Sequence, residues 1–166
     1  GFHNVWMIDP GMKADDARGP ADRPESDLAR EPQSARSVRE QELARYRSML
    51  ESGRQADVFV KNASGAEFRG AVWPGDCVFP DFTTPRVRAW WASLYRPFLA
   101  HGVSGVWNDM NEPALFNVES KTMPADNRHE GDPSMRTPAG TPQGSRSADT
   151  HARYHNVYGM QMIRGT

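Results

Sequence analysis

The sequence has 166 residues, of which 37% are apolar and 25% charged, a balance typical of a globular protein. Twenty lysines and arginines nearly balance 21 aspartates and glutamates, so no net field would attract nucleic acid or an anionic membrane. No apolar run approaches the roughly 20 residues that span a bilayer, and the single cysteine, Cys77, excludes an intrachain disulfide framework. Neither nucleic acid nor a membrane is therefore expected as a partner. The single cysteine and the lack of a visible signal peptide favour the cytoplasm without establishing it.

The N-terminal part predicts a short strand followed by a charged insertion. The apolar run over residues 5–8 stops at Asp9, where a Pro-Gly pair signals a turn. Residues 13–45 are then dense in Asp, Glu and Arg and are interpreted as an insertion whose first half is a solvated loop. A solvated surface excursion is the main hypothesis for this insertion, and binding of a partner or a second subunit is the alternative. The oligomeric state stays open.

The second half of the insertion predicts a helix. Residues 37–40 have the Ser-x-x-Glu pattern of a capping box, and Gly53 is expected to end the helix. Apolar residues recur between them at helical spacing, namely Leu43, Tyr46 and Leu50.

A β-hairpin is predicted next. Residues 57–61 and 66–70 alternate in polarity around the turn sequence 62–65. Residues 71–75 are then expected to lead into a loop that ends near residues 81–83.

The following segment predicts a helix and a strand. Thr84 and Pro85 have the pattern of an N-cap followed by a proline in the first turn, and Gly102 ends the helical pattern before a strand over 103–107. A helix that passes through a glycine turn into an apolar strand is half of a parallel α/β unit. The large apolar residues of the predicted helix form one wide face, and most of them, including Trp90 and Trp91, are expected to lie in the core. This apolar face comprises Val87, Trp90, Trp91, Leu94, Tyr95 and Phe98.

The C-terminal third predicts a long loop and a last helix. Residues 117–147 are rich in Pro, Gly, Ser and Thr, which is typical of a rim loop or lid. Asp149 is expected to cap a helix with apolar residues at Tyr154, Val157, Tyr158, Met162 and Ile163.

The densest cluster of chemical groups is residues 107–113, Trp-Asn-Asp-Met-Asn-Glu-Pro, directly after a predicted strand. Carboxyl ends of parallel strands carry the chemistry of α/β enzymes, and both predicted parallel strands end in a carboxylate, Asp9 and Asp109. A carboxylate walled by Trp107, Met110 and Phe116 suits a sugar, and glycosidases need two such carboxylates. Two alternatives stay open: that Asp109 and Glu112 are themselves the pair, or that Asp109 only caps a turn.

The block 107–113 resembles the nucleophile signature of glycoside hydrolase family 31, the α-glucosidase family. Further blocks resemble this family in the same order, namely 8–11, 57–61, 72–75, 79–83 with Trp90-Trp91, and 155–159. Residues 13–45 depart from the pattern, because the family has a shorter connection there. The resemblance implies an α/β fold, part of a (β/α)8 barrel comprising about two βα units, over residues 1–166.

By this resemblance Asp109 is the nucleophile, which forms a covalent glycosyl-enzyme. Trp107 and Met110 line the pocket of the reacting sugar, and Trp73 and Phe116 form its apolar wall. Asp9 faces the same pocket, and Glu112 supports the nucleophile. No cofactor or metal is implied, and the substrate is an oligosaccharide or an α-glucoside.

The resemblance places the general acid/base beyond residue 166, so the sequence is expected to be an incomplete barrel without activity on its own. The expected parent is a retaining α-glucosidase. The alternatives are an α-xylosidase or transglucosidase of the same family, or a carbohydrate-binding protein without catalysis.

Three smaller signals have simpler explanations. His151 and His155 have a spacing that suits zinc, but no third ligand is evident. Residues 62–64 match a glycosylation sequon, which matters only in a secretory pathway. Cys77 is expected to be a buried, inert thiol.

Overall fold

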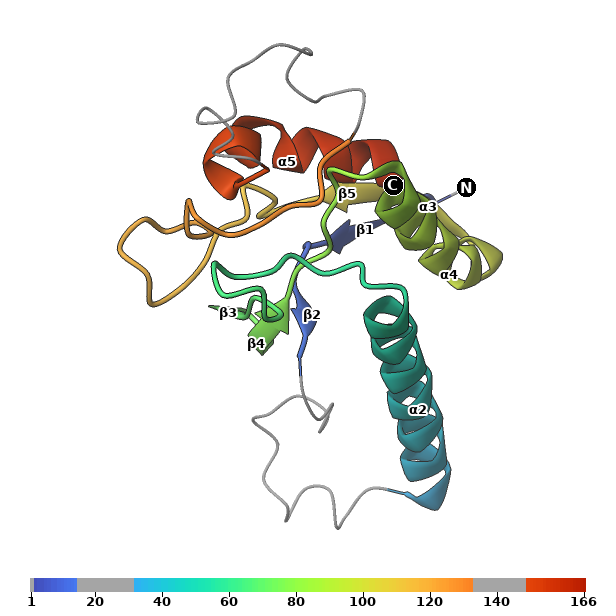
Figure 1. Ribbon diagram of the computed structural model, residues 1–166. Helices are drawn as coiled ribbons and strands as arrows, with labels where there is room; N and C mark the ends of the chain where they lie inside the picture. The colour runs from blue at the N-terminus through green and yellow to red at the C-terminus, as the bar shows by residue number, and fades with distance from the viewer. Residues whose placement is uncertain (1, 15–31, 133–148) are drawn as a thin grey trace, which may run out of the picture.

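A computed structural model describes residues 2–14, 32–132 and 149–166 (Figure 1). The elements in these ranges are β1 (Asn4–Ile8), β2 (Met12–Lys13), α2 (Gln33–Gln55), β3 (Gly70–Val72), β4 (Gly75–Val78), α3 (Pro85–Leu94), α4 (Arg96–Ala100), β5 (Val103–Asn108) and α5 (His151–Gly165). The first half of the predicted insertion, residues 15–31, and the end of the predicted rim loop, residues 133–148, lie outside the described residues. None of the described helices combines the length and the hydrophobicity of a membrane span.

The two strands that were predicted to be parallel form a parallel pair. β1 lies beside β5 in a register that pairs Met7 with Trp107 and Ile8 with Asn108. One face of the pair packs on the helices, since Ile8 and Val106 contact the hydrophobic core. On the opposite face Met7 and Trp107 are 62% and 63% exposed. The pair therefore has one covered face and one open face.

A second, antiparallel sheet has the strand order β2-β4-β3. The prediction of a loop from residue 75 to residues 81–83 is wrong at its start, because residues 75–78 form β4. The hairpin between β3 and β4 closes at Trp73 and Pro74, and Gly75 has a φ of 101° that suits glycine. Cys77 is fully buried in this sheet.

The predicted hairpin at residues 57–70 has its turn but no regular strands. Gly65 N donates to Asn62 O at 2.9 Å and Asn62 N to Ala66 O at 2.8 Å, and a single bridge joins Lys61 to Glu67. Phe68 N donates to Val60 O at 2.9 Å, so part of the hairpin pairing is present. Residues 58–60 also pair with residues 79–81, with 2.9 Å between Val60 N and Phe79 O. Local pairing is thus limited to isolated bonds, and long-range pairing is added to it.

Helix α2 projects from the rest of the molecule (Figure 1). It begins at Gln33, so Ser37 lies inside the helix and the predicted capping box is wrong. Gly53 does not end the helix either. It is buried, and a Cβ there would lie 2.8 Å from the Phe59 ring and 2.9 Å from the Trp90 ring, so glycine permits close packing. Leu50 is buried, as its helical spacing predicted.

The helix after residue 84 starts as predicted, because Val87 N donates to Thr84 Oγ1 at 3.2 Å. It divides into α3 and α4 at Tyr95, since Pro97 has no N–H for a continuous helix. Trp91 is buried in the core and Trp90 packs against it, which confirms their expected structural role.

Helix α5 contains the predicted apolar residues but is not capped by Asp149. The N-cap is Thr150, without a side-chain bond, and Asp149 instead adopts a φ of 46° and accepts a hydrogen bond from Tyr154 Oη at 2.9 Å. Ile163 is exposed, whereas Tyr158 and Met162 are fully buried.

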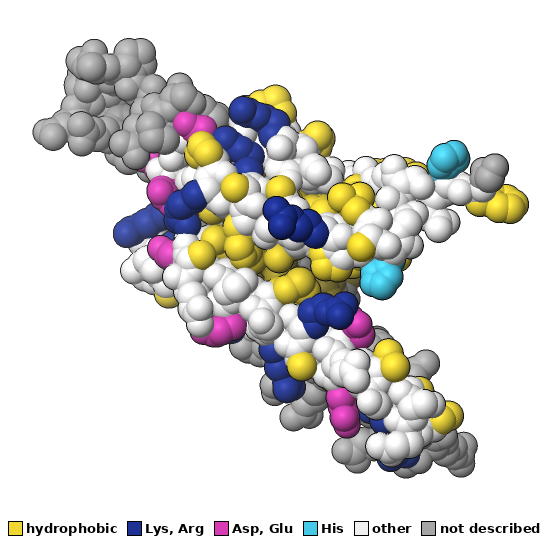
Figure 2. Space-filling view, turned by 90° about the vertical axis from the view of Figure 1, so that its right-hand side faces the viewer, with side chains coloured by type: hydrophobic (Ala, Val, Ile, Leu, Met, Phe, Trp, Pro, Cys, Tyr) yellow, Lys and Arg dark blue, Asp and Glu magenta, His cyan; other side chains and the backbone are white. Residues whose placement is uncertain are grey.

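Hydrophobic side chains gather over the middle of the molecule in Figure 2.

Candidate active site

Two carboxylates follow the two parallel strands at the same edge. Asp9 comes directly after β1 and Asp109 directly after β5, and Asp109 N donates to Ile8 O at 3.2 Å. Because neighbouring strands lie about 5 Å apart, the pairing brings these two residues side by side. Side chains alternate along a strand, so both residues follow Met7 and Trp107 on the open face.

The two carboxylates have different surroundings. Burial raises the pKa of Asp9 above its ordinary value, and the negative charge of Asp109 raises it further. Asp9 Oδ1 is buried and has no hydrogen-bond partner among the described residues. Asp109 Oδ1, by contrast, accepts a hydrogen bond from Met110 N at 3.0 Å. Burial and, to a smaller extent, the nearby like charge therefore make Asp9 hold a proton more readily than an isolated aspartate does.

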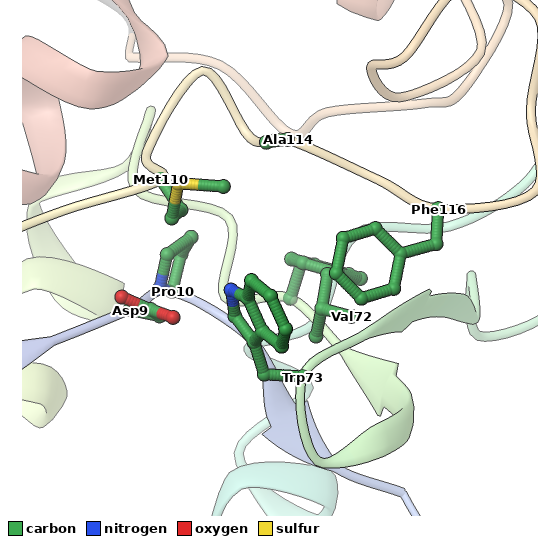
Figure 3. A pocket seen from close by; sticks show the side chains of 9 residues that line it. Asp9, Pro10, Val72, Trp73, Met110, Ala114 and Phe116 are labelled. Carbon is green, nitrogen blue, oxygen red and sulfur yellow. The ribbon is translucent and has the colours of Figure 1, made fainter.

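An aromatic cleft adjoins these carboxylates (Figure 3). Trp73 and Phe116 form one wall, with ring centroids 5.1 Å apart and planes nearly perpendicular at 89°. Figure 3 shows Trp73 between Asp9 and Phe116, with Met110 above Pro10 and Asp9 in this view. The lining residues are Asp9, Pro10, Gly11, Val72, Trp73, Phe79, Met110, Ala114 and Phe116.

The hairpin β3-β4 and the segment after β5 position the aromatic wall together. Trp73 lies in the hairpin turn, and Phe116 N donates to Ala71 O at 2.8 Å, which attaches the segment to β3. Leu115 is buried against Gly70, where a Cβ would lie 3.0 Å from a methyl group of Leu115. Two parts of the chain that are about 40 residues apart thus form one wall, held by backbone contacts.

Helix α5 contacts the segment that carries Asp109 on both sides of it. Asn111 Nδ2 donates to Gly159 O at 3.4 Å, and Thr166 Oγ1 donates to Asn108 Oδ1 at 3.0 Å. Sequence analysis noted the block 155–159 only as part of the family resemblance and gave it no role. The glycine was the available signal, because helix-internal glycines often mark close packing.

The structure brings together five of the seven predicted site residues, namely Asp9, Trp73, Met110, Asp109 and Phe116. Trp107 lies on the open face below Asp109 and does not line the cleft. Glu112 is exposed on the turn after Asp109. The cleft residues that sequence analysis missed, such as Val72 and Phe79, had no signal other than their apolar character. Within the described ranges, no group of three or more His, Cys, Asp or Glu side chains is arranged to hold a metal ion.

Parallel βα connectivity with polar groups at the carboxyl ends of the strands is the arrangement found in α/β barrel domains. Residues 1–166 match the sequence model of a protein family that is described as "Glycosyl hydrolases family 31 TIM-barrel domain". The chain therefore belongs to glycoside hydrolase family 31, and its partial α/β fold is part of the family's TIM barrel.

Similar proteins agree with this assignment. The chain is 40% identical over 118 residues to Alpha-glucosidase 2 of Bacillus thermoamyloliquefaciens, which is 71% of this chain and 13% of that protein. It resembles the crystal structure of the family 31 alpha-glucosidase from Bacteroides thetaiotaomicron with a TM-score of 0.55 and 36% identity, over 99% of this chain and 19% of that one. ER glucosidase II, solved as a complex of its catalytic subunit with the binding domain of its regulatory subunit, gives a TM-score of 0.62 and 26% identity, over 99% and 13% of the two chains.

Proposed function

We propose that this chain is the central part of a retaining α-glucosidase, which removes terminal α-linked glucose through a covalent intermediate on Asp109. The observation that carries this proposal is the position of Asp109. Its carboxylate follows a parallel strand directly, next to an aromatic cleft with an open side. In retaining glycosidases a carboxylate beside the sugar attacks the anomeric carbon, and water then hydrolyses the glycosyl ester.

The aromatic cleft supports a sugar as the substrate. Trp73 is 73% exposed although it is a large aromatic residue, so its ring face is available to a ligand. The rings of Phe116 and Trp73 pack against each other in an edge-to-face arrangement. Met110 supplies flexible apolar surface beside the carboxylates. In the proposed complex these side chains contact the apolar face of the pyranose ring, and Trp107 contacts the sugar from the open face.

Asp9 and Glu112 are proposed to assist Asp109. Asp9, directly after β1, is its immediate neighbour, and the raised pKa of Asp9 makes it able to share a proton with the reacting groups. Glu112 lies three residues further along the turn and supports the turn from the solvent side. The general acid/base must stand on the opposite side of the glycosidic bond, about 5–5.5 Å from the nucleophile in a retaining enzyme. We propose that another segment of the barrel supplies it.

The chain spans 13% of the length of Alpha-glucosidase 2, so the test uses the full-length protein that contains it. Incubation with 5-fluoro-glucosyl fluoride, followed by proteolysis and mass spectrometry, should place the label on Asp109. The variant Asp109→Asn should lose the label and the activity, while Glu112→Gln should keep the label. Labelling of a different residue would disprove the assignment of the nucleophile.

Substrate comparison separates the alternatives within the family. Turnover of nitrophenyl α-glucoside above nitrophenyl α-xyloside supports the proposal, and the reverse order supports an α-xylosidase. Transfer of glucose to added maltose in preference to water would identify a transglucosidase. Binding of glucose without any turnover would identify a carbohydrate-binding protein. The isolated 166 residues are expected to show no turnover.

A further inference from the structure

A row of three imidazoles runs from a buried carboxylate to the surface of α5. His129 Nδ1 lies 2.7 Å from Asp81 Oδ1, and His129 Nε2 lies 3.1 Å from His151 Nδ1. His151 Nε2 lies 3.3 Å from His155 Nδ1. Asp81, His129 and His151 are buried, and His155 is half-buried. We call these four residues the histidine network.

The carboxylate of Asp81, which acts only as a hydrogen-bond acceptor, determines the direction of the hydrogen bonds along the network. Its carboxylate also accepts hydrogen bonds from Thr83 N at 3.2 Å, from Thr83 Oγ1 at 2.6 Å and from Glu130 N at 2.6 Å. An ionised carboxylate only accepts, so His129 donates from Nδ1, and its Nε2 accepts when the ring is neutral. With Nε2 of His129 as an acceptor, His151 donates from Nδ1, and its own Nε2 then accepts from Nδ1 of His155. Each neutral ring therefore carries its proton on Nδ1.

The charges agree with this arrangement. Burial opposes ionisation of Asp81, but the hydrogen bonds from His129, Thr83 and Glu130 lower its pKa overall. Burial, with smaller contributions from His129 and His155 and against the opposite effect of Asp81, lowers the pKa of His151 to about 4. The middle ring is therefore neutral at ordinary pH, as the row requires.

The network lies on the same face of α5 as the contact with the nucleophile segment. His151, His155 and Gly159 are each four residues apart and form one stripe on the helix. At Gly159 a Cβ would lie 2.8 Å from the backbone oxygen of Asn111, so the helix and the segment after Asp109 are in close contact. Displacement of the first turns of α5 would therefore displace Asn111.

We propose that His129, His151 and His155 are positioning residues, which hold α5 at the place where Gly159 fixes Asn111 and, through it, Asp109. The network joins three separate parts of the chain, namely the segment before α3, the segment 127–132 and α5. Backbone bonds run beside it, with 2.8 Å between His151 N and Asn127 O and 2.6 Å between His129 N and Asp149 O. The effect on catalysis rests on the proposed role of Asp109.

The groups that face the imidazoles come from all the packed elements. Asp81 comes from the segment before α3, and Glu130, which pairs with Arg86, comes from the segment after β5. Helix α5 and the residues before it add Tyr154, Tyr158, Asp149 and Arg153. Of these groups, Asp81 is the one whose side chain accepts a hydrogen bond from an imidazole of the network, and it sets the direction.

The test compares two variants of His155, the half-buried end of the network, in the full-length protein. His155→Leu removes the donor to His151 Nε2, whereas an amide N–H of His155→Gln can replace it. Leu should lower kcat about tenfold with KM changed less than about twofold, since small displacements of reacting groups cost up to about 100-fold. Gln should keep at least half of kcat. His101→Leu, the same change at the exposed residue directly after α4, is the control. Equal values for Leu and Gln, or a change in KM alone, would overturn the proposal.

Two readouts do not depend on activity, so they separate this proposal from the proposed function. Amide hydrogen exchange in a peptide covering residues 108–112 should be about tenfold faster in His155→Leu than in His155→Gln, and equal rates would overturn the proposal. Nitrogen NMR of labelled histidine at pH 7.5 should show His151 as a neutral ring with the proton on Nδ1. A proton on Nε2 of His151 would contradict the assigned direction.

Discussion

The stability of α5 should fall in weak acid because of His151. Its pKa is about 4 in the folded protein, against an ordinary value of 6.5. The unfolded state therefore binds more protons between these values, and the stabilisation is complete above pH 6.5 and is lost as the pH falls toward 4. With about 1.4 kcal/mol for each tenfold difference in proton affinity, the loss is about 2 kcal/mol at pH 5 and about 3 kcal/mol at pH 4.

Hydrogen exchange of the α5 amides measures this loss as a local opening free energy, after correction for the intrinsic effect of pH. A loss of 2 kcal/mol corresponds to an open population about 30 times larger at pH 5 than at neutral pH. The variant His151→Asn provides the comparison, because its side chain has a donor for His129 and does not titrate. It should be less stable at pH 7.5 but should lose less on acidification. If the wild-type protein and the variant lose the same free energy between pH 7 and 5, His151 is not the group responsible.

Three other predictions concern the cleft, an ion pair and the thiol. Trp73→Ala should raise KM about tenfold, because an exposed aromatic contact to the sugar is lost, and should leave the melting temperature within a degree or two; an unchanged KM would contradict its role. Asp132→Asn should lower the free energy of unfolding, measured in urea, by about 3 kcal/mol, because it leaves buried Arg88 without its charge partner. Glu130→Gln, which removes the exposed ion pair with Arg86, should lower it by less than about 1 kcal/mol. Burial raises the pKa of Cys77 to about 12, so the native thiol should not react with iodoacetamide at pH 8, and labelling at the rate of the denatured protein would refute its burial.

Sequence analysis succeeded where the determining physics was local. The N-cap at Thr84, the strands around residues 5–8 and 103–107, and the carboxylates that follow them depend on neighbours along the chain, and the structure confirms them. The position of Asp109 beside the cleft required the family resemblance, because Trp73 lies in a turn far from it in sequence.

Other features depended on tertiary contacts and could not be predicted. Residues 75–78 begin with Gly-Asp, which is unfavourable for a strand, and become β4 because β2 and β3 pair with both of its sides. Gly53 has the pattern of a helix end, but the rings of Phe59 and Trp90 explain its presence. The histidine network joins residues 81, 129 and 151, and no periodicity relates positions so far apart.

The pairing of β1 with β5 also has a consequence for the length of the chain between them. Asp9 and Asp109 meet only when a loop of about 95 residues closes, and the entropic cost of closure grows with the logarithm of loop length, as about (3/2)RT ln n. The predicted insertion of about 30 residues lengthens that loop by roughly half, which costs only about 0.4 kcal/mol. The two carboxylates can therefore stay together while the intervening sequence gains or loses a segment of this size.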